Sequence, residues 1–253
     1  MVLAAALKQA VKERIIPYNP CDNCRIPPKE KKEMAIILPE KLGVYLGEAE
    51  KYGVLPMFFL ELFSGLRRGE LLALQWDDLN LKDRILSVSK QVTRIDGELV
   101  VTEPKTKNSV RKVALSQQAV DMLVREHEQH PDNPILFPSP RTGGYWSPDA
   151  VSRINRKLLA KAGIEEHIRF HDLRHTFATM ALSSGVDVKT LSSMLGHFSA
   201  GFTLDTYTHI TNDMQRGAAE KIGGFMETAT AKPEPPDPPE ESRCKVIPFE
   251  RVG

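Results

Sequence analysis

The chain of 253 residues carries 41% hydrophobic and 26% charged residues, and its formal net charge at pH 7 is +1. These values are typical of a globular protein and argue against a collagen-like, wholly disordered or membrane protein, since no apolar run approaches the roughly 18 residues of a spanning helix. The balanced charge also lacks the basic excess of many nucleic-acid binders, but phosphate contacts depend on one face of a protein and not on its total charge.

The cysteines and the N-terminus indicate a cytoplasmic protein. The three cysteines, Cys21, Cys24 and Cys244, are an odd number without a disulfide framework, as expected in a reducing compartment. The short apolar run at the N-terminus lacks a basic leader and continues as an amphipathic segment, which argues against an export signal. A lone C-x-x-C needs a second pair of cysteines or histidines to bind zinc, so we interpret Cys21 and Cys24 as linker sequence.

Residue patterns divide the chain into three parts, residues 1–32, 33–225 and 226–253. Apolar residues at helical spacing predict a helix over residues 3–16. Four prolines and a charged run follow in residues 17–32, a composition typical of an extended linker. The last part is rich in proline and glutamate and cannot bury enough apolar surface to fold, so we expect it to be disordered.

The central part predicts an α+β fold that is mainly helical, with one small sheet. A helix over residues 39–52 is followed by the apolar run of residues 54–63, which is long enough for a buried helix that Gly65 ends. Asp96-Gly97 supplies a tight turn between the first two of three β-type segments. These segments predict a three-stranded antiparallel meander over residues 84–93, 98–103 and 110–115. The remaining periodic segments predict helices over residues 117–129, 148–162, 171–184, 188–195, 203–207 and 211–222.

The segment SGLRRGELLALQW places Arg67 and Arg68 directly after a glycine break and at the start of a helix. A guanidinium beside free backbone donors suits a phosphodiester. A solvated arginine pair is an equally good interpretation of this motif alone. Glu70, three residues after Arg67, is expected to orient an arginine or to cap the helix.

The segment EPKTKNSVRK places Lys105 and Lys107 in the turn of the second hairpin, from which a long cationic side chain can reach beyond the sheet. Lysines in exposed turns usually only add to solubility. This position therefore indicates catalysis only in combination with other motifs.

The segment RFHDLRHTFATMAL places His171, Arg174 and His175 on one face of a helix. Zinc is one candidate ligand, because His171 and His175 have the spacing of the H-E-x-x-H motif. Asp172 is shorter than the glutamate of that motif, and Arg174 would place a fixed positive charge beside the metal, so an anion is the better ligand. For His175 a purely structural role is also a reasonable interpretation.

The segment LGHFSAGFTLDTYTH contains His197 and, further along, Tyr207. A tyrosine is seldom a nucleophile, because its phenol has a pKa near 10 and is protonated at neutral pH. Two arginines, a lysine and two histidines are the side chains needed to activate Tyr207, provided that the fold brings them together.

Taken in order, these motifs resemble those of the tyrosine recombinases, also called the phage integrase family. The resemblance extends over residues 38–224, and the motifs look like those of integrases from phages and conjugative transposons. It implies the tyrosine recombinase catalytic fold for residues 33–225. It also implies that residues 1–32 are the remnant of a core-binding domain, ending in a helix and a linker.

The resemblance implies a site-specific recombinase that cleaves and rejoins DNA and so integrates or excises a mobile element. Tyr207 would attack the scissile phosphate to give a 3′-phosphotyrosyl bond and a 5′-hydroxyl. Arg67 and Arg174 would hold the non-bridging oxygens. Lys105 would protonate the leaving oxygen, His171 would accept the proton of Tyr207 and His197 would donate to a phosphate oxygen.

The resemblance further implies no metal and no other cofactor. Its expected partners are double-stranded DNA at attachment or core sites and other copies of the chain, in a tetramer on two duplexes with the helix over residues 211–222 docking onto a neighbour. Supporting contacts with DNA are expected from Arg68, Lys107, Arg111 and His175.

Two alternatives remain. A type IB topoisomerase shares the tyrosine and the cationic residues, but the compact HDLRH and LGH motifs favour a recombinase. A DNA-binding module without activity is the other, and the intact set of six catalytic positions argues against it.

Overall fold

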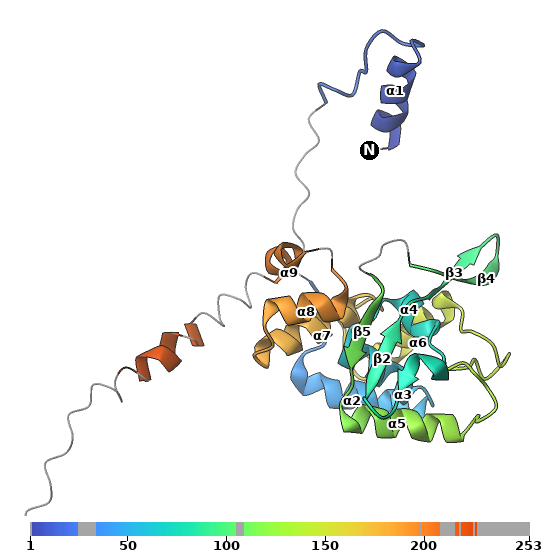
Figure 1. The fold of residues 1–253 in the computed structure, drawn as a ribbon, viewed down its shortest axis with the longest axis vertical. Coiled ribbons are helices and arrows are strands. Elements are labelled where there is room, and N and C mark those ends of the chain that lie inside the picture. The colour runs from blue at the N-terminus through green and yellow to red at the C-terminus, as the bar shows by residue number, and fades with distance from the viewer. Residues whose placement is uncertain are drawn as a thin grey trace, which may run out of the picture. The chain divides into compact units, whose positions relative to one another are not determined.

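The computed structural model describes residues 2–24, 34–104, 109–197, 199–207, 216–217, 219–224 and 226. The chain forms two compact units, Met1–Ala35 and Ile36–Gly253 (Figure 1).

The first unit contains one helix, α1 (Val2–Lys12), among its described residues. This helix ends four residues before the predicted end at residue 16. The reason is local: Arg14 adopts a left-handed conformation with φ of 59°, and the amide of Ile15 donates to the carbonyl of Ala10. This backbone pattern closes a helix end. The loop that follows is held by Asn19, whose side chain accepts from the amide of Cys21 at 3.0 Å.

The core of the second unit is built around α3 (Leu55–Ser64), which packs against α2 (Pro39–Lys51), α5 (Gln117–Glu128) and α7 (Asp172–Ser183). Both α2 and α3 begin with a proline in the first turn, where the missing amide proton costs nothing. Six of the ten residues of α3 are buried, in keeping with its largely apolar sequence. Helix α6 (Pro148–Lys161) adds Asn155, which accepts a hydrogen bond from the hydroxyl of buried Tyr45 at 2.7 Å.

The strands form two separate antiparallel sheets. One has the order β1 (Leu79–Asn80), β2 (Ile85–Val88) and β5 (Arg111–Ala114), and the other pairs β3 (Gln91–Ile95) with β4 (Glu98–Thr102). The fold class, mainly helical with a small three-stranded sheet, is confirmed.

The predicted meander is wrong in its pairing. The single segment expected over residues 84–93 is interrupted at Ser89 and Lys90, so that its first half pairs with β5 and its second half with β4. Asp96 and Gly97 form the predicted turn, both with positive φ. The tip of the resulting β3–β4 hairpin projects beyond the helices of this unit (Figure 1), while β3 packs against α4.

The remaining elements bring together segments that are distant in sequence. They are α4 (Arg68–Leu72), the 3-10 helix η1 (Trp76–Asp78), α8 (Val188–Leu195) and α9 (Ala200–Thr206). Helix α8 packs against α7, α9 and β5, and α4 packs against β3 and α6. Of the helix predicted over residues 211–222, the structure describes residues 216, 217 and 219–222, which are helical. None of the described helices is both long and apolar enough to cross a bilayer.

Gly65 ends α3 in a left-handed conformation with φ of 58°, against the side chains of α7 and α8. A Cβ at this position would overlap Cδ1 of Phe177 and lie 2.9 Å from Cδ2 of Leu195. Both the backbone conformation and the close packing therefore require glycine.

We expect Gly65→Ala to lower the free energy of unfolding by about 2–4 kcal/mol, the sum of the left-handed backbone cost and overpacking. Urea denaturation measures this change. Gly163→Ala is the matched control, since Gly163 has φ of 64° but nothing within 4 Å of an added Cβ. The control should lose only the backbone part, about 1–2 kcal/mol. Equal losses in the two variants would contradict the packing argument.

Glu61 is a buried carboxyl group in α3, with 1% of its surface exposed. Neither of its oxygens has a hydrogen-bond partner among the described residues. Burial raises the pKa of Glu61 well above its usual value, although the charge of Arg174 acts in the opposite direction. The folded protein therefore holds a proton on Glu61 more tightly than the unfolded chain does.

The stability that comes from protonated Glu61 is fully present below the unfolded pKa and is lost as the pH rises through the folded pKa. We expect Glu61→Gln to remove this loss, so that the variant gains on the wild type by up to about 1.4 kcal/mol per pH unit in that window. Unfolding measured from pH 4 to 8 provides the comparison. The exposed Glu98→Gln controls for the removal of one carboxyl group, and a constant difference across this range would show that Glu61 is ionised in the fold.

Candidate active site

Arg67 and Glu70 form the first part of the site, at the start of α4. Glu70 accepts from the amide of Arg67 at 2.9 Å and from its guanidinium at 2.7 Å. The carboxylate therefore caps the helix and orients the arginine, the two roles predicted for it. The other side of the guanidinium donates to the carbonyl of Gly196 at 3.1 Å.

Arg174 lies at the same place but comes from α7, and its surface is only 3% exposed. Its guanidinium donates to the carbonyls of Gly65 at 2.7 Å and Leu195 at 2.6 Å, and so joins the ends of α3 and α8. Burial, followed by the charges of Arg67 and Arg111, lowers the pKa of Arg174 to about 10. The group is therefore still charged at neutral pH.

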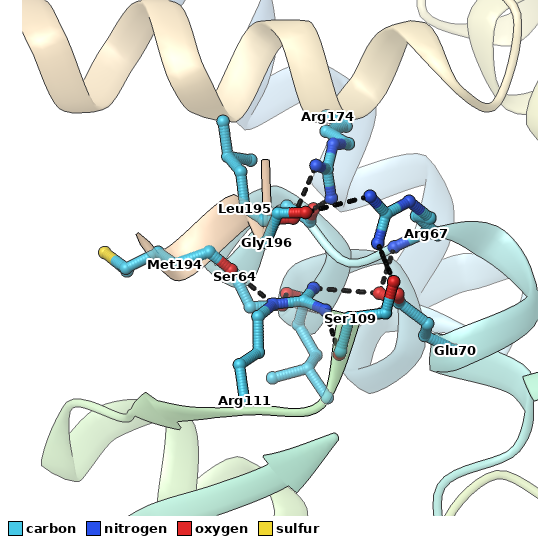
Figure 2. Close-up of polar contacts among 11 residues, drawn as sticks. Ser64, Arg67, Glu70, Ser109, Arg111, Arg174, Met194, Leu195 and Gly196 are labelled. Carbon is cyan, nitrogen blue, oxygen red and sulfur yellow. Dashed lines mark hydrogen bonds and ion pairs between the residues drawn. The ribbon is translucent and has the colours of Figure 1, made fainter. Parts of the chain in front are cut away.

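Arg111, from β5, is the third arginine of the cluster (Figure 2). It donates to the carbonyl of Met194 at 2.6 Å and to Glu70 at 2.8 Å. Burial would raise the pKa of Glu70, but the hydrogen bond and charge of Arg111 lower it below its usual value. The cluster thus combines three guanidiniums with one ionised carboxylate.

The internal contacts of Arg111 were missed by the sequence analysis, which treated this residue as a supporting DNA contact. Its side chain is 6% exposed and faces the interior of the protein. The signal in the sequence was the alternation of β5, because Arg111 stands two positions before Val113, which is fully buried.

His171, the N-cap of α7, and His175, within α7, lie on one face, as predicted, with ring centroids 5.5 Å apart. The structure brings His175, and not His171, to the hydroxyl of Tyr207, with Nδ1 and Oη 2.7 Å apart. Loss of surrounding water, followed by neighbouring positive charge, lowers the pKa of both imidazoles, that of His175 to about 4. Both are therefore neutral at pH 7.

Tyr207 directly follows α9 and has 1% of its surface exposed. Burial raises the pKa of Tyr207 to about 12, and the charge of Arg174 only partly opposes this shift. In this structure the phenol is therefore protonated and not activated.

His197 follows the C-terminus of α8, and its Nδ1 lies 2.8 Å from Oγ1 of Thr203 in α9. Burial, together with the charges of Arg174 and Arg67, lowers the pKa of His197 to about 4. Its imidazole is consequently neutral at pH 7, and a neutral ring still carries one N–H donor.

The predicted lysines, Lys105 and Lys107, lie outside the described residues. The described chain resumes at Ser109, whose hydroxyl is 3.4 Å from the guanidinium of Arg67.

Arg68 points away from the cluster toward α6 and donates to the hydroxyl of Ser152. It lines a cavity of about 530 Å³ whose cationic lining also includes Arg156 and Arg169. One of these charges is already compensated, because Arg169 pairs with Asp172 at 2.8 Å. His171, which the sequence analysis expects to accept the proton of Tyr207, borders the same cavity.

The sequence of this chain matches the model of the phage integrase family over residues 48–214. The integrase of ICEBs1 from Bacillus subtilis is 31% identical over 239 residues, which are 88% of this chain and 64% of that protein. A XerC-like tyrosine recombinase from Caldanaerobacter subterraneus is 30% identical over 246 residues, which are 86% of this chain and 62% of that protein. The chain thus spans just under two thirds of the length of these relatives.

Solved structures share the fold. The Tn1549 transposon integrase, in complex with a circular intermediate DNA, superposes with a TM-score of 0.74 at 23% identity, covering 87% of this chain and 76% of that one. A lambda integrase dimer bound to a core site gives a TM-score of 0.60 at 22% identity, covering 81% and 57%. The matched family segment contains the whole arginine cluster, His197 and Tyr207, and the chain belongs to the phage integrase family.

Proposed function

We propose that this chain is the catalytic part of a site-specific DNA recombinase that cleaves and rejoins DNA through a 3′-phosphotyrosyl bond to Tyr207, and so integrates or excises a mobile element. The observation that carries the proposal is the convergence of Arg67, Arg111 and Arg174 on the consecutive carbonyls of residues 194–196 (Figure 2). Folding brings these three positive charges together, and the ionised carboxylate of Glu70 balances only one of them. Such an arrangement is unfavourable unless the cluster binds an anion.

In this proposal Arg67 and Arg174 bind the non-bridging oxygens of the scissile phosphate. Their planar guanidiniums can each donate two hydrogen bonds to a phosphate, and their positions are fixed before the substrate arrives. Arg111 and Glu70 act indirectly by holding Arg67. Charge that develops on the phosphorus oxygens is then stabilised without reorganisation of the protein.

Proton transfer is assigned to two further residues, Lys105 and His171, and a hydrogen bond to the phosphate is assigned to His197. Lys105 protonates the 5′-oxygen as the P–O5′ bond breaks, and His171 accepts the phenol proton as the bond from Oη of Tyr207 to phosphorus forms. His197 donates its ring N–H to a phosphate oxygen, for which its neutral state at pH 7 is sufficient. The phosphotyrosyl bond conserves the energy of the broken phosphodiester, so a 5′-hydroxyl of a second duplex can reverse the reaction without a cofactor.

The proposed partners are double-stranded DNA and further copies of this chain. Integrases with the same fold have been solved on DNA, as in the Tn1549 and lambda complexes. Arg68 borders a cationic cavity, which supports a contact with the DNA backbone, and Lys107 is assigned the same role. For Arg111 and His175 the contacts inside the protein support indirect roles instead. We assign residues 33–225 to the catalytic domain and the helix over residues 211–222 to docking in a tetramer.

A nicked suicide duplex that carries the core site of the element tests the nucleophile. Loss of the short fragment beside the nick prevents religation, so the wild-type protein should accumulate a covalent adduct that migrates slowly on denaturing gels. Tyr207→Phe should give none, because phenylalanine has no oxygen to form the bond. Tyr52→Phe, at an exposed tyrosine, is the matched control. Adduct formation by Tyr207→Phe would show that another residue attacks the phosphate.

The role of Lys105 is tested with a 5′-bridging phosphorothiolate, whose thiolate leaves without needing a proton. Lys105→Ala should cleave ordinary DNA at least 10²-fold more slowly than wild type, the usual range for loss of a general acid. On the phosphorothiolate the two proteins should cleave at similar rates. Lys107→Ala serves as the control and should need no rescue; a defect of Lys105→Ala that persists on the sulfur substrate would rule out proton donation.

A further inference from the structure

His175 contacts the hydroxyl of Tyr207, although neither the motif pattern nor the proposed chemistry gives it a role at that atom. Its Nδ1 lies 2.7 Å from Oη, and the two ring centroids are 5.9 Å apart. The residues are separated by 32 positions, with His175 in α7 and Tyr207 directly after α9, so the bond is a tertiary contact and does not follow from local geometry.

The contact holds the tyrosine in a position from which it cannot react. With 1% of the Tyr207 surface exposed, its hydroxyl is not accessible to a phosphate on a DNA duplex. The hydroxyl must therefore leave Nδ1 of His175 before it can attack. Because Tyr207 directly follows α9, this step moves its side chain away from His175 of α7.

We propose that His175 is a positioning residue that holds the Tyr207 hydroxyl in a buried, unreactive place, and that DNA cleavage begins with the breaking of this hydrogen bond. The inference rests on the proposed function for the assignment of Tyr207 as the nucleophile. It assigns His175 to the control of the tyrosine and not to the binding of DNA.

The electrostatic surroundings favour a neutral pair. The ionisable groups near His175 on α7 are Asp172 and Arg174. The others are Arg169 and His171 before α7, His197 after α8, and Tyr207. The pKa values of about 4 for His175 and about 12 for Tyr207 leave both uncharged at neutral pH. A phenol is the stronger donor of the two, so the hydroxyl donates to Nδ1, and the proton is not transferred in this arrangement.

Nitration by tetranitromethane tests the restraint without DNA, because the reagent attacks accessible, ionised phenols. The full chain contains internal standards: Tyr18 is 71% exposed, whereas Tyr45 is fully buried and hydrogen-bonded to Asn155. Mass spectrometry of peptides gives the rate at each tyrosine. We expect His175→Ala to raise the rate at Tyr207 by about 2- to 10-fold, the equivalent of one hydrogen bond, with Tyr45 unchanged.

His175→Asn is the conservative variant. Its side-chain oxygen can accept from the hydroxyl near the place of Nδ1, so nitration of Tyr207 should return toward the wild-type rate. An unchanged rate at Tyr207 in His175→Ala would overturn the proposal. If the nitration rates of Tyr45 and Tyr207 rise together, the core has loosened, and a second measurement decides. It compares the ¹⁵N resonance of His175 Nδ1 between the wild type and Tyr207→Phe. A shift supports the hydrogen bond, and no shift overturns the proposal.

Cleavage of the suicide duplex at limiting DNA provides the functional result. Removing the restraint should raise the second-order rate constant of adduct formation in His175→Ala by the same factor as nitration. A fall in this rate would identify His175 as a group needed in the chemistry and would overturn the restraint. If the wild-type chain forms no adduct, the proposed function fails, whereas the nitration result still decides whether His175 holds Tyr207.

Discussion

The arrangement of the site depends on the C-terminus of α8. The last carbonyls of a helix have no partners within it, and they carry the negative end of its dipole. Here three consecutive carbonyls, those of Met194, Leu195 and Gly196, each accept from a different arginine. One helix end thereby fixes guanidiniums from α4, β5 and α7 relative to one another.

Glu70 completes this arrangement from the other side. Its two oxygens contact Arg67 and Arg111, and each pair is short, at 2.7 and 2.8 Å. A buried ion pair contributes little net stability when its desolvation is counted, but it defines position closely. The cluster is therefore better understood as a device for orientation than as a source of stability. Without an anion to bind, the clustered arginines would lower the stability of the fold through their mutual repulsion.

Local signals in the sequence predicted much of this structure. Gly65 ends α3 because only glycine fits its conformation and its neighbours, and Glu70 has both contacts that its spacing from Arg67 indicated. Long-range pairing could not be predicted in this way. Whether the half-strand before Ser89 joins β5 or β4 depends on partners that lie elsewhere in the chain, and the pattern of alternation is the same in either case.

The contacts of Arg111 and His175 could not be predicted either, because their partners are distant in sequence. Met194 is 83 residues from Arg111, and Tyr207 is 32 residues from His175. Residue type and spacing singled out candidate side chains, but they did not predict which of the described ones touch. The order of motifs therefore does not predict the state of Tyr207, which lies buried and whose pKa is raised by burial to about 12.

The break between β2 and β3 has a consequence for how the protein can vary. The base of the hairpin lies against α4, where the carbonyl of Val92 approaches Gly69, while residues 94–98 are exposed. Since the hairpin has its own ladder, a longer or shorter tip leaves the pairing of β2 with β5 in register. The turn beyond Arg94 can therefore change in length during evolution, while the root of the hairpin stays packed against the helix that begins beside Arg67.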